Sequence, residues 1–161
     1  MNAKVVAAII LFCITVVGCV VCISFMGRNN EPNSGIEPIS ALDAVILEVK
    51  ENSVTNTKLT LIIKNTASDE YGFGEQFTIE KWVDGEWCQL PYVHENVGWF
   101  SIGYALEGNS TQEKDIDWTE YYGELSPGDY RITKRFSYIR SPGDYDDYYI
   151  SANFTIDWFV Y

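Results

Sequence analysis

The chain has 161 residues, of which 47% are hydrophobic and 15% aromatic, enough apolar material to bury the core of one domain. This composition excludes an intrinsically disordered chain. Lys4 and Arg28 are the only charged residues before residue 29, so the rest carries 9 basic and 23 acidic side chains, a net charge of −14. Because so acidic a surface repels phosphate groups, nucleic acid is excluded as a partner. Acidity keeps a small domain soluble, and it also suits a cationic partner or Ca²⁺.

The N-terminal segment, residues 5–26, is a run of 22 residues without a charge, VVAAIILFCITVVGCVVCISFM. About 20 apolar residues span the hydrocarbon core of a bilayer, so this segment is long enough to cross it. Lys4 precedes the run and acids soon follow Arg28, which favours an N-terminus inside the cell and a domain outside. We therefore expect residues 1–28 to be a membrane anchor or a lipoprotein signal.

The stretch Val16–Cys19, VVGC, resembles a bacterial lipobox, in which Cys19 would be lipidated after cleavage behind Gly18. The apolar run continues past Cys19, however, and a cleavable signal prefers a shorter apolar region of about 7–15 residues. An uncleaved single-pass anchor is therefore favoured over a lipid anchor, with ordinary cleavage as the third alternative. Both leading interpretations place the protein at the cell membrane.

Residues 29–40 are rich in Asn, Pro, Ser and Gly and predict a flexible linker. From residue 41 to residue 161 the dominant pattern is the period-two alternation of β-strands. The predicted strands span residues 45–49, 58–66, 76–83, 86–90, 99–106, 111–117, 130–138 and 149–158. Asp84-Gly85 is a strong two-residue hairpin signal, and no helical stripe occurs outside the N-terminal segment. Seven to eight short strands with turn residues between them predict an all-β fold, an antiparallel sandwich or barrel.

The pentapeptide SPGDY occurs twice, and its first copy, Ser126–Tyr130, precedes a long strand. Pro127 presets φ for a turn, and Gly128 can adopt a positive φ. Many immunoglobulin-like sandwiches have a tyrosine at this point whose hydroxyl bonds back to the corner backbone. We therefore expect Tyr130 to form a tyrosine corner.

This corner and the stretch Glu70–Leu90 together resemble the bacterial immunoglobulin-like domain of membrane-anchored or lipoprotein-type surface proteins. The resemblance covers about residues 42–158 and rests on Tyr71-Gly72, Ile79-Glu80-Lys81, Asp84-Gly85 with Trp87, and Leu125 through Arg131. It implies an immunoglobulin-like antiparallel β-sandwich displayed outside the cell. It implies no catalytic residues, and a fold by itself does not give a function.

The second copy, Ser141–Tyr145, is predicted to be the hairpin loop between the last two strands. Asp144, Asp146 and Asp147 cluster there and could supply part of a Ca²⁺ shell, which needs six to eight oxygen ligands. The spacing matches no EF-hand loop, so a solvated acidic loop is the favoured interpretation.

Catalytic machinery is not recognisable in the sequence. His94 is the only histidine, and Cys88 shares a strand face with Leu90, which favours a buried inert thiol. Neither a phosphate-binding glycine loop nor a nucleophile elbow occurs. We therefore predict a protein that is not an enzyme and needs no cofactor. A carboxylate pair for hydrolysis of wall glycans stays open among the 23 acids.

The surplus of aromatic residues is the remaining functional signal. Trp99 and Phe100, in ENVGWFS, are the best candidates for ligand binding, although core filling is the favoured role of that pair. The sequence thus predicts a membrane-tethered, extracytoplasmic binding or interaction module whose partner is a protein or a cell-wall polymer. A structural or sensory ectodomain that assembles with membrane partners through its anchor is the alternative, and a wall-glycan hydrolase is a weaker one.

Overall fold

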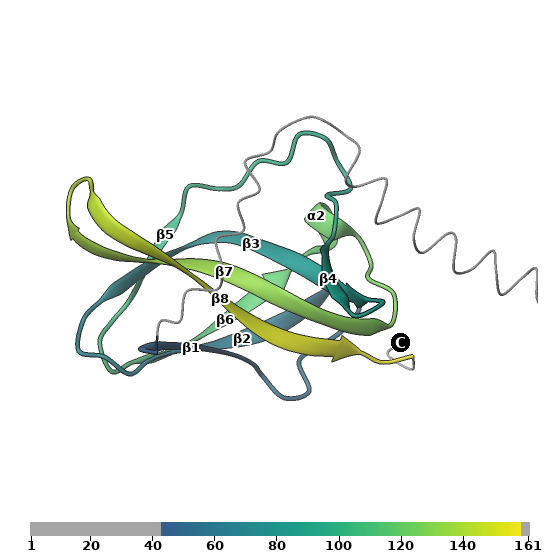
Figure 1. Cartoon of the computed structure of the whole chain (residues 1–161), viewed down its shortest axis with the longest axis horizontal. Helices are drawn as coiled ribbons and strands as arrows, with labels where there is room; N and C mark the ends of the chain where they lie inside the picture. The colour runs from purple at the N-terminus through teal and green to yellow at the C-terminus, as the bar shows by residue number, and fades with distance from the viewer. Residues whose placement is uncertain (1–42, 159–161) are drawn as a thin grey trace, which may run out of the picture. The chain divides into compact units, whose positions relative to one another are not determined.

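The computed structural model describes residues 43–158 (Figure 1). The predicted anchor over residues 1–28, its Cys19 and the linker over residues 29–40 lie outside the described residues. Within residues 43–158, no helix is long and apolar enough to cross a membrane. The elements are β1 (Val45–Val49), β2 (Lys58–Asn65), β3 (Tyr71–Val83), β4 (Glu86–Gln89), β5 (Gly103–Leu106), β6 (Thr111–Asp117), α2 (Thr119–Tyr122), β7 (Gly128–Ser141) and β8 (Asp144–Ile156).

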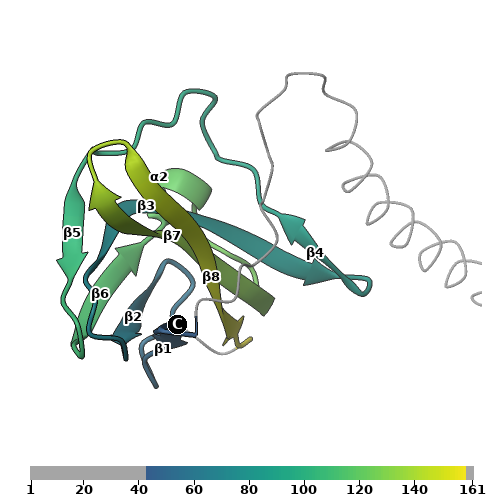
Figure 2. The same ribbon diagram turned by 60° about the vertical axis from the view of Figure 1, so that its left-hand side comes forward.

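The strands form two sheets, and all the strand pairs are antiparallel. One sheet has the order β1-β2-β6, and the other has the order β4-β3-β7-β8 with β5 also paired to β3. β4 and β5 pair with opposite ends of β3, and Figure 2 shows them at opposite ends of the domain. The prediction of an all-β antiparallel fold is therefore confirmed.

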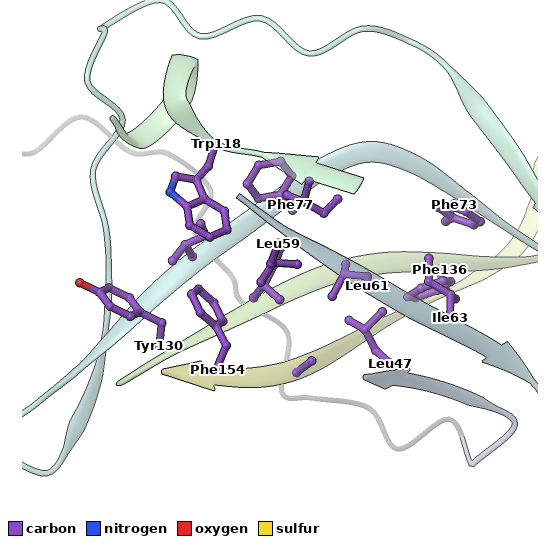
Figure 3. Close-up of a cluster of buried hydrophobic side chains, with 14 of the residues drawn as sticks. Leu47, Leu59, Leu61, Ile63, Phe73, Phe77, Trp118, Tyr130, Phe136 and Phe154 are labelled. Atoms are coloured by element: carbon purple, nitrogen blue, oxygen red, sulfur yellow. The ribbon is translucent and has the colours of Figure 1, made fainter. Parts of the chain in front are cut away.

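The core lies between the two sheets and takes alternate side chains from their strands, as expected for half-buried strands. Leu59, Leu61 and Ile63 of β2 face the aromatic residues of β3, β7 and β8 (Figure 3). The fully buried Trp118 packs against Phe154, and its indole N–H donates to the Asn56 carbonyl at 3.0 Å. Large rings thus fill this core. Residues 43–158 contain a single cysteine, Cys88, which is half-buried.

Lys134 occupies a core position in the middle of β7 and is only 1% exposed. Its ammonium group donates to the carbonyls of Gly74, Glu75 and Gln76 at 2.8, 3.3 and 3.2 Å. These three carbonyls belong to the irregular part of β3, where the register against β7 shifts between Phe73 and Phe77. Burial lowers the pKa of Lys134 to about 8. The lysine therefore provides hydrogen-bond donors to carbonyls at a point where the pairing of β3 with β7 is interrupted.

The alternation located the strands but not their full lengths. β7 and β8 continue to Ser141 and Asp144, beyond the predicted limits at residues 138 and 149, and form a projecting hairpin (Figure 1). Residues 139–146 are all exposed, so this part of the hairpin has no buried face to impose an apolar alternation. The four-residue helix α2 was not predicted, because it is too short to produce a helical stripe.

Candidate binding surface

The first SPGDY copy forms a corner at the start of β7 in which the tyrosine is buried. The Tyr130 hydroxyl donates to the Ser126 carbonyl at 2.6 Å, and the tyrosine is 1% exposed. Figure 3 shows this hydroxyl directed away from the core cluster. Gly128 has a φ of 150°, and the Lys81 ammonium lies 5.1 Å from the centroid of the Tyr130 ring. The corner therefore has the bond that a tyrosine corner requires.

The second copy forms the exposed tip of the β7–β8 hairpin. Asp144 and Asp146 both accept hydrogen bonds from Arg140, and Asp147 accepts from Ser137 at 2.5 Å and from Arg135 at 3.3 Å. In the described part of the chain, no three His, Cys, Asp or Glu side chains are grouped to hold a metal ion. The calcium site stays a hypothesis from sequence, and the arrangement of these carboxylates does not support it.

The structure separates the two residues of the predicted aromatic pair. The Trp99 ring stacks on Tyr121 at a centroid distance of 4.0 Å and forms an edge-to-face contact with Phe77 at a centroid distance of 5.0 Å. Phe100, in contrast, is 72% exposed. Trp99 is thus anchored by packing against the core, and only Phe100 is available at the surface.

Glu75, at the bulge of β3, forms a polar cluster with Lys114 of β6 and Tyr104 of β5. The Tyr104 hydroxyl donates to the Glu75 carboxylate, and Lys114 donates to Glu75 at 2.8 Å and to Tyr104 at 2.9 Å. Burial alone would raise the pKa of Glu75, but the bonds from Lys114 and Tyr104 outweigh it and lower the pKa. Burial alone would lower the pKa of Lys114, but the same bonds raise it. Because the three groups bond to one another, this cluster joins the two sheets and is not a candidate acid or base.

A second aromatic pair, which the sequence did not single out as a site, lies on the outer face of the five-stranded sheet. Trp82 and Trp87 are register partners in β3 and β4, with ring centroids 4.9 Å apart at 61°. Trp82 is 44% exposed. Together with Asp129 and Thr155, which pair across β7 and β8, they line a groove of about 390 Å³. The Asp84-Gly85 turn was the available signal, since a two-residue loop places residue 82 opposite residue 87.

An ion pair fixes one side of this groove. Arg131 donates to the Glu80 carboxylate through Nε, and through Nη2 at 2.8 Å, a bidentate geometry. The Arg131 guanidinium also lies 4.9 Å from the centroid of the Trp87 ring. Glu80 points outward but is only 3% exposed. The charge of Arg131 is therefore neutralised at the sheet face, where the guanidinium covers the Trp87 ring.

Comparison with known proteins assigns the fold family. The family model described as bacterial Ig-like domain matches residues 42–155, and the chain belongs to this family. No curated protein matches the chain. Among solved structures, the archaellum periplasmic stator protein FlaG from Sulfolobus acidocaldarius is 10% identical, with a TM-score of 0.35. That match covers 70% of this chain and 99% of the other, and at this TM-score it carries no functional argument. The resemblance expected from the sequence is therefore confirmed at the level of the family.

Proposed function

We propose that the protein is a membrane-tethered, extracytoplasmic binding module that engages its partner through the outer face of the five-stranded sheet. The carrying observation is the set of large hydrophobic side chains exposed there, near the start of β7 and at the tip of the β7–β8 hairpin, because exposed apolar groups on one face are candidates for interaction sites. Trp82 is 44%, Ile139 61% and Tyr145 54% exposed, and Ile139 and Tyr145 are register partners.

The outer face of the three-stranded sheet provides the contrast. Two surface ion pairs bridge its strands, Lys50 with Glu113 at 2.7 Å and Lys64 with Glu48 at 2.6 Å. Its one large exposed hydrophobic side chain within the described residues is Ile46, at 40%. Ion pairs occur on both sheets, but the five-stranded sheet exposes three large hydrophobic side chains where this one exposes Ile46, so we assign partner binding to the five-stranded sheet.

Membrane tethering and orientation are supported by sequence alone. The uncharged run at residues 5–26, with Lys4 before it, is long enough to span a bilayer with the domain outside. Protease added to intact bacteria should therefore digest the domain. Mass spectrometry of the mature N-terminus should find an unprocessed residue 1–26 segment, whereas acylated Cys19 would indicate a lipid anchor. A domain that is digested only after lysis would contradict the proposed location.

A binding role is favoured over catalysis by the site chemistry. The polar groups at the sheet face, including Glu80 and Arg131, are bonded to one another, and the groove is lined mainly by rings and neutral polar groups. Turnover of a wall glycan that disappears when one pair of acids is changed would overturn this assignment.

The binding face can be tested with the full-length chain in neutral detergent, immobilised and exposed to membrane and wall fractions. Trp82→Ala combined with Ile139→Ser and Tyr145→Ser should lose the captured partner. Ile46→Ser, on the other sheet, is the matched control and should retain it. Equal capture by all forms would indicate assembly through the anchor instead.

A further inference from the structure

We infer that the groove beside Trp82 is a site for an arginine- or lysine-bearing segment of a partner polypeptide. This inference rests on the proposed function and names the partner chemistry of that sheet face. The groove is lined by Trp82, Trp87, Asp129, Tyr130, Asn153, Phe154 and Thr155.

The register across four strands builds the groove. Trp87 is opposite Trp82 in β4 and β3, and Asp129 is opposite Thr155 in β7 and β8. The neighbouring row places Arg131 opposite both Glu80 and Asn153. Because residues two apart on a strand share a face, aromatic and polar side chains stand next to one another on the same outer surface.

The site is preorganised before any ligand arrives. The Glu80–Arg131 pair is bidentate, and its guanidinium holds the Trp87 ring from one side. Trp87 in turn contacts Trp82, a residue that is 44% exposed. A ligand therefore meets an aromatic surface whose orientation is already fixed, which limits the entropy lost on binding.

Charge selects the class of ligand. Asp129 is the one charged residue of the groove lining, and none of the salt bridges found within residues 43–158 involves it. Its Oδ1 accepts a hydrogen bond from the Thr155 hydroxyl at 2.8 Å, which orients the carboxylate. The nearby Asp84 and Glu86 are acidic and exposed, and residues 29–161 carry a net charge of −14. A cation above an indole face and beside a carboxylate is attracted by both, whereas an anion is repelled.

The chain itself contains the contact that we assign to the ligand. The Arg131 guanidinium lies over Trp87, and Lys114 lies 4.1 Å from the centroid of the Tyr104 ring. Each of these cations also bonds to a carboxylate, Glu80 or Glu75. Trp82 and Asp129 offer the same two partners, a ring and an acid, to a cation from another molecule.

The test is a fluorescence-anisotropy titration of the full-length chain, in neutral detergent, with a labelled ten-residue peptide that alternates arginine and glycine. The control peptide has citrulline in place of arginine, which keeps the shape and removes the charge. We expect Trp82→Ala to weaken binding of the arginine peptide about tenfold and Asp129→Asn about threefold or more. The citrulline peptide should not bind measurably.

Two matched variants separate the groove from general attraction to an acidic protein. Glu48→Gln removes one negative charge from the other sheet, and Phe100→Ala removes an exposed ring outside the groove; both should leave the affinity unchanged. If Trp82→Ala does not fold by its thermal unfolding curve, the comparison of Asp129→Asn with Glu48→Gln decides. Equal weakening by those two variants, or binding of the citrulline peptide, would overturn the inference.

Competition with a neutral oligosaccharide, chitohexaose, tests whether the groove binds a wall polysaccharide and not a cationic polypeptide. Binding of the sugar that requires Trp82, without binding of the arginine peptide, would contradict a cationic ligand. The titration with the arginine peptide does not depend on where the protein lies in the cell. The groove assignment and the proposed function can therefore fail separately. Partner capture without peptide binding overturns only the groove assignment, and peptide binding without partner capture leaves the groove and overturns only the proposed function.

Discussion

The two copies of SPGDY have the same five residues and end in different structures. In the first, Ser126–Tyr130, the tyrosine is 1% exposed; in the second, Ser141–Tyr145, it is 54% exposed. The first copy leads into β7, where the Tyr130 ring stacks on Phe154 of β8 with the ring centroids 5.4 Å apart. The second lies at the tip of a hairpin whose residues 139–146 are all exposed. The pentapeptide therefore forms a bend before a strand in one copy and a hairpin turn in the other, and the cover provided by the rest of the fold decides whether its tyrosine is buried.

The largest expected difference between the copies comes from truncating the two tyrosines. Tyr130→Ala removes a buried ring and its hydrogen bond and should reduce the free energy of unfolding by about 3–5 kcal/mol. Tyr145→Ala removes an exposed ring and should change it by less than about 0.5 kcal/mol. Urea unfolding of both variants measures the difference, and equal losses would contradict the assignment of one corner to the core.

Two of the cations of β7, Lys134 and Arg140, extend the comparison to pH. Burial lowers the pKa of Lys134 from 10.5 to about 8, while the exposed Arg140 bonds to two acids. Between these two pKa values of Lys134, the unfolded chain binds the lysine proton and the folded chain has released it. Stability relative to Lys134→Met should therefore rise as pH increases through this window, by up to about 3 kcal/mol.

Arg140→Gln is the control for the pH measurement. Because arginine stays charged throughout that window, the difference in unfolding free energy between wild type and Arg140→Gln should not depend on pH. If the difference in unfolding free energy between wild type and Lys134→Met is also independent of pH, then burial does not lower the pKa of Lys134.

The glycines of the two turns should differ by a smaller amount. Gly128 has a φ of 150°, and a Cβ there would lie 2.9 Å from Lys81 Cε. Gly143 has a φ of 82°, and a Cβ there would meet no other atom within 4 Å. We expect Gly128→Ala to cost about 1–3 kcal/mol and Gly143→Ala about 1 kcal/mol, measured by thermal unfolding. The opposite order would show that the first turn is not the more constrained one.

The smallest effect isolates the corner hydrogen bond. Tyr130→Phe should lower the free energy of unfolding by about 0.5–1.5 kcal/mol, and Tyr145→Phe should leave it unchanged. No loss in Tyr130→Phe would mean that the bond to the Ser126 carbonyl does not stabilise the fold.

Much of the sheet architecture was predictable because it depends on local chemistry. The alternation in Leu59, Leu61 and Ile63 located a buried strand, and Asp84-Gly85 located a hairpin. The Pro-Gly turn and Tyr130 indicated the corner, whose bond to Ser126 the structure contains. In each case, a few neighbouring residues carry the whole signal.

The candidate site was less predictable because it depends on register between distant strands. Trp82 and Asp129 meet only after β3, β7 and β8 have aligned, and Arg131 finds Glu80 in the same way. Lys134 is buried in the core, and the bulge carbonyls that hold it could not be inferred from its sequence neighbours. Trp99 and Phe100 have different environments, because Tyr121 stacks on Trp99 while Phe100 is exposed.

The central claim is that the outer face of the five-stranded sheet contacts a partner outside the cell. It is tested most directly by replacing either Trp82 or Ile46 with a photo-crosslinking phenylalanine analogue in the full-length chain in living bacteria. Both positions are exposed to a similar extent, 44% and 40%, on opposite sheets. We predict a crosslinked adduct at position 82 and none at position 46. Adducts of equal yield at both positions, or an adduct only at position 46, would contradict the claim.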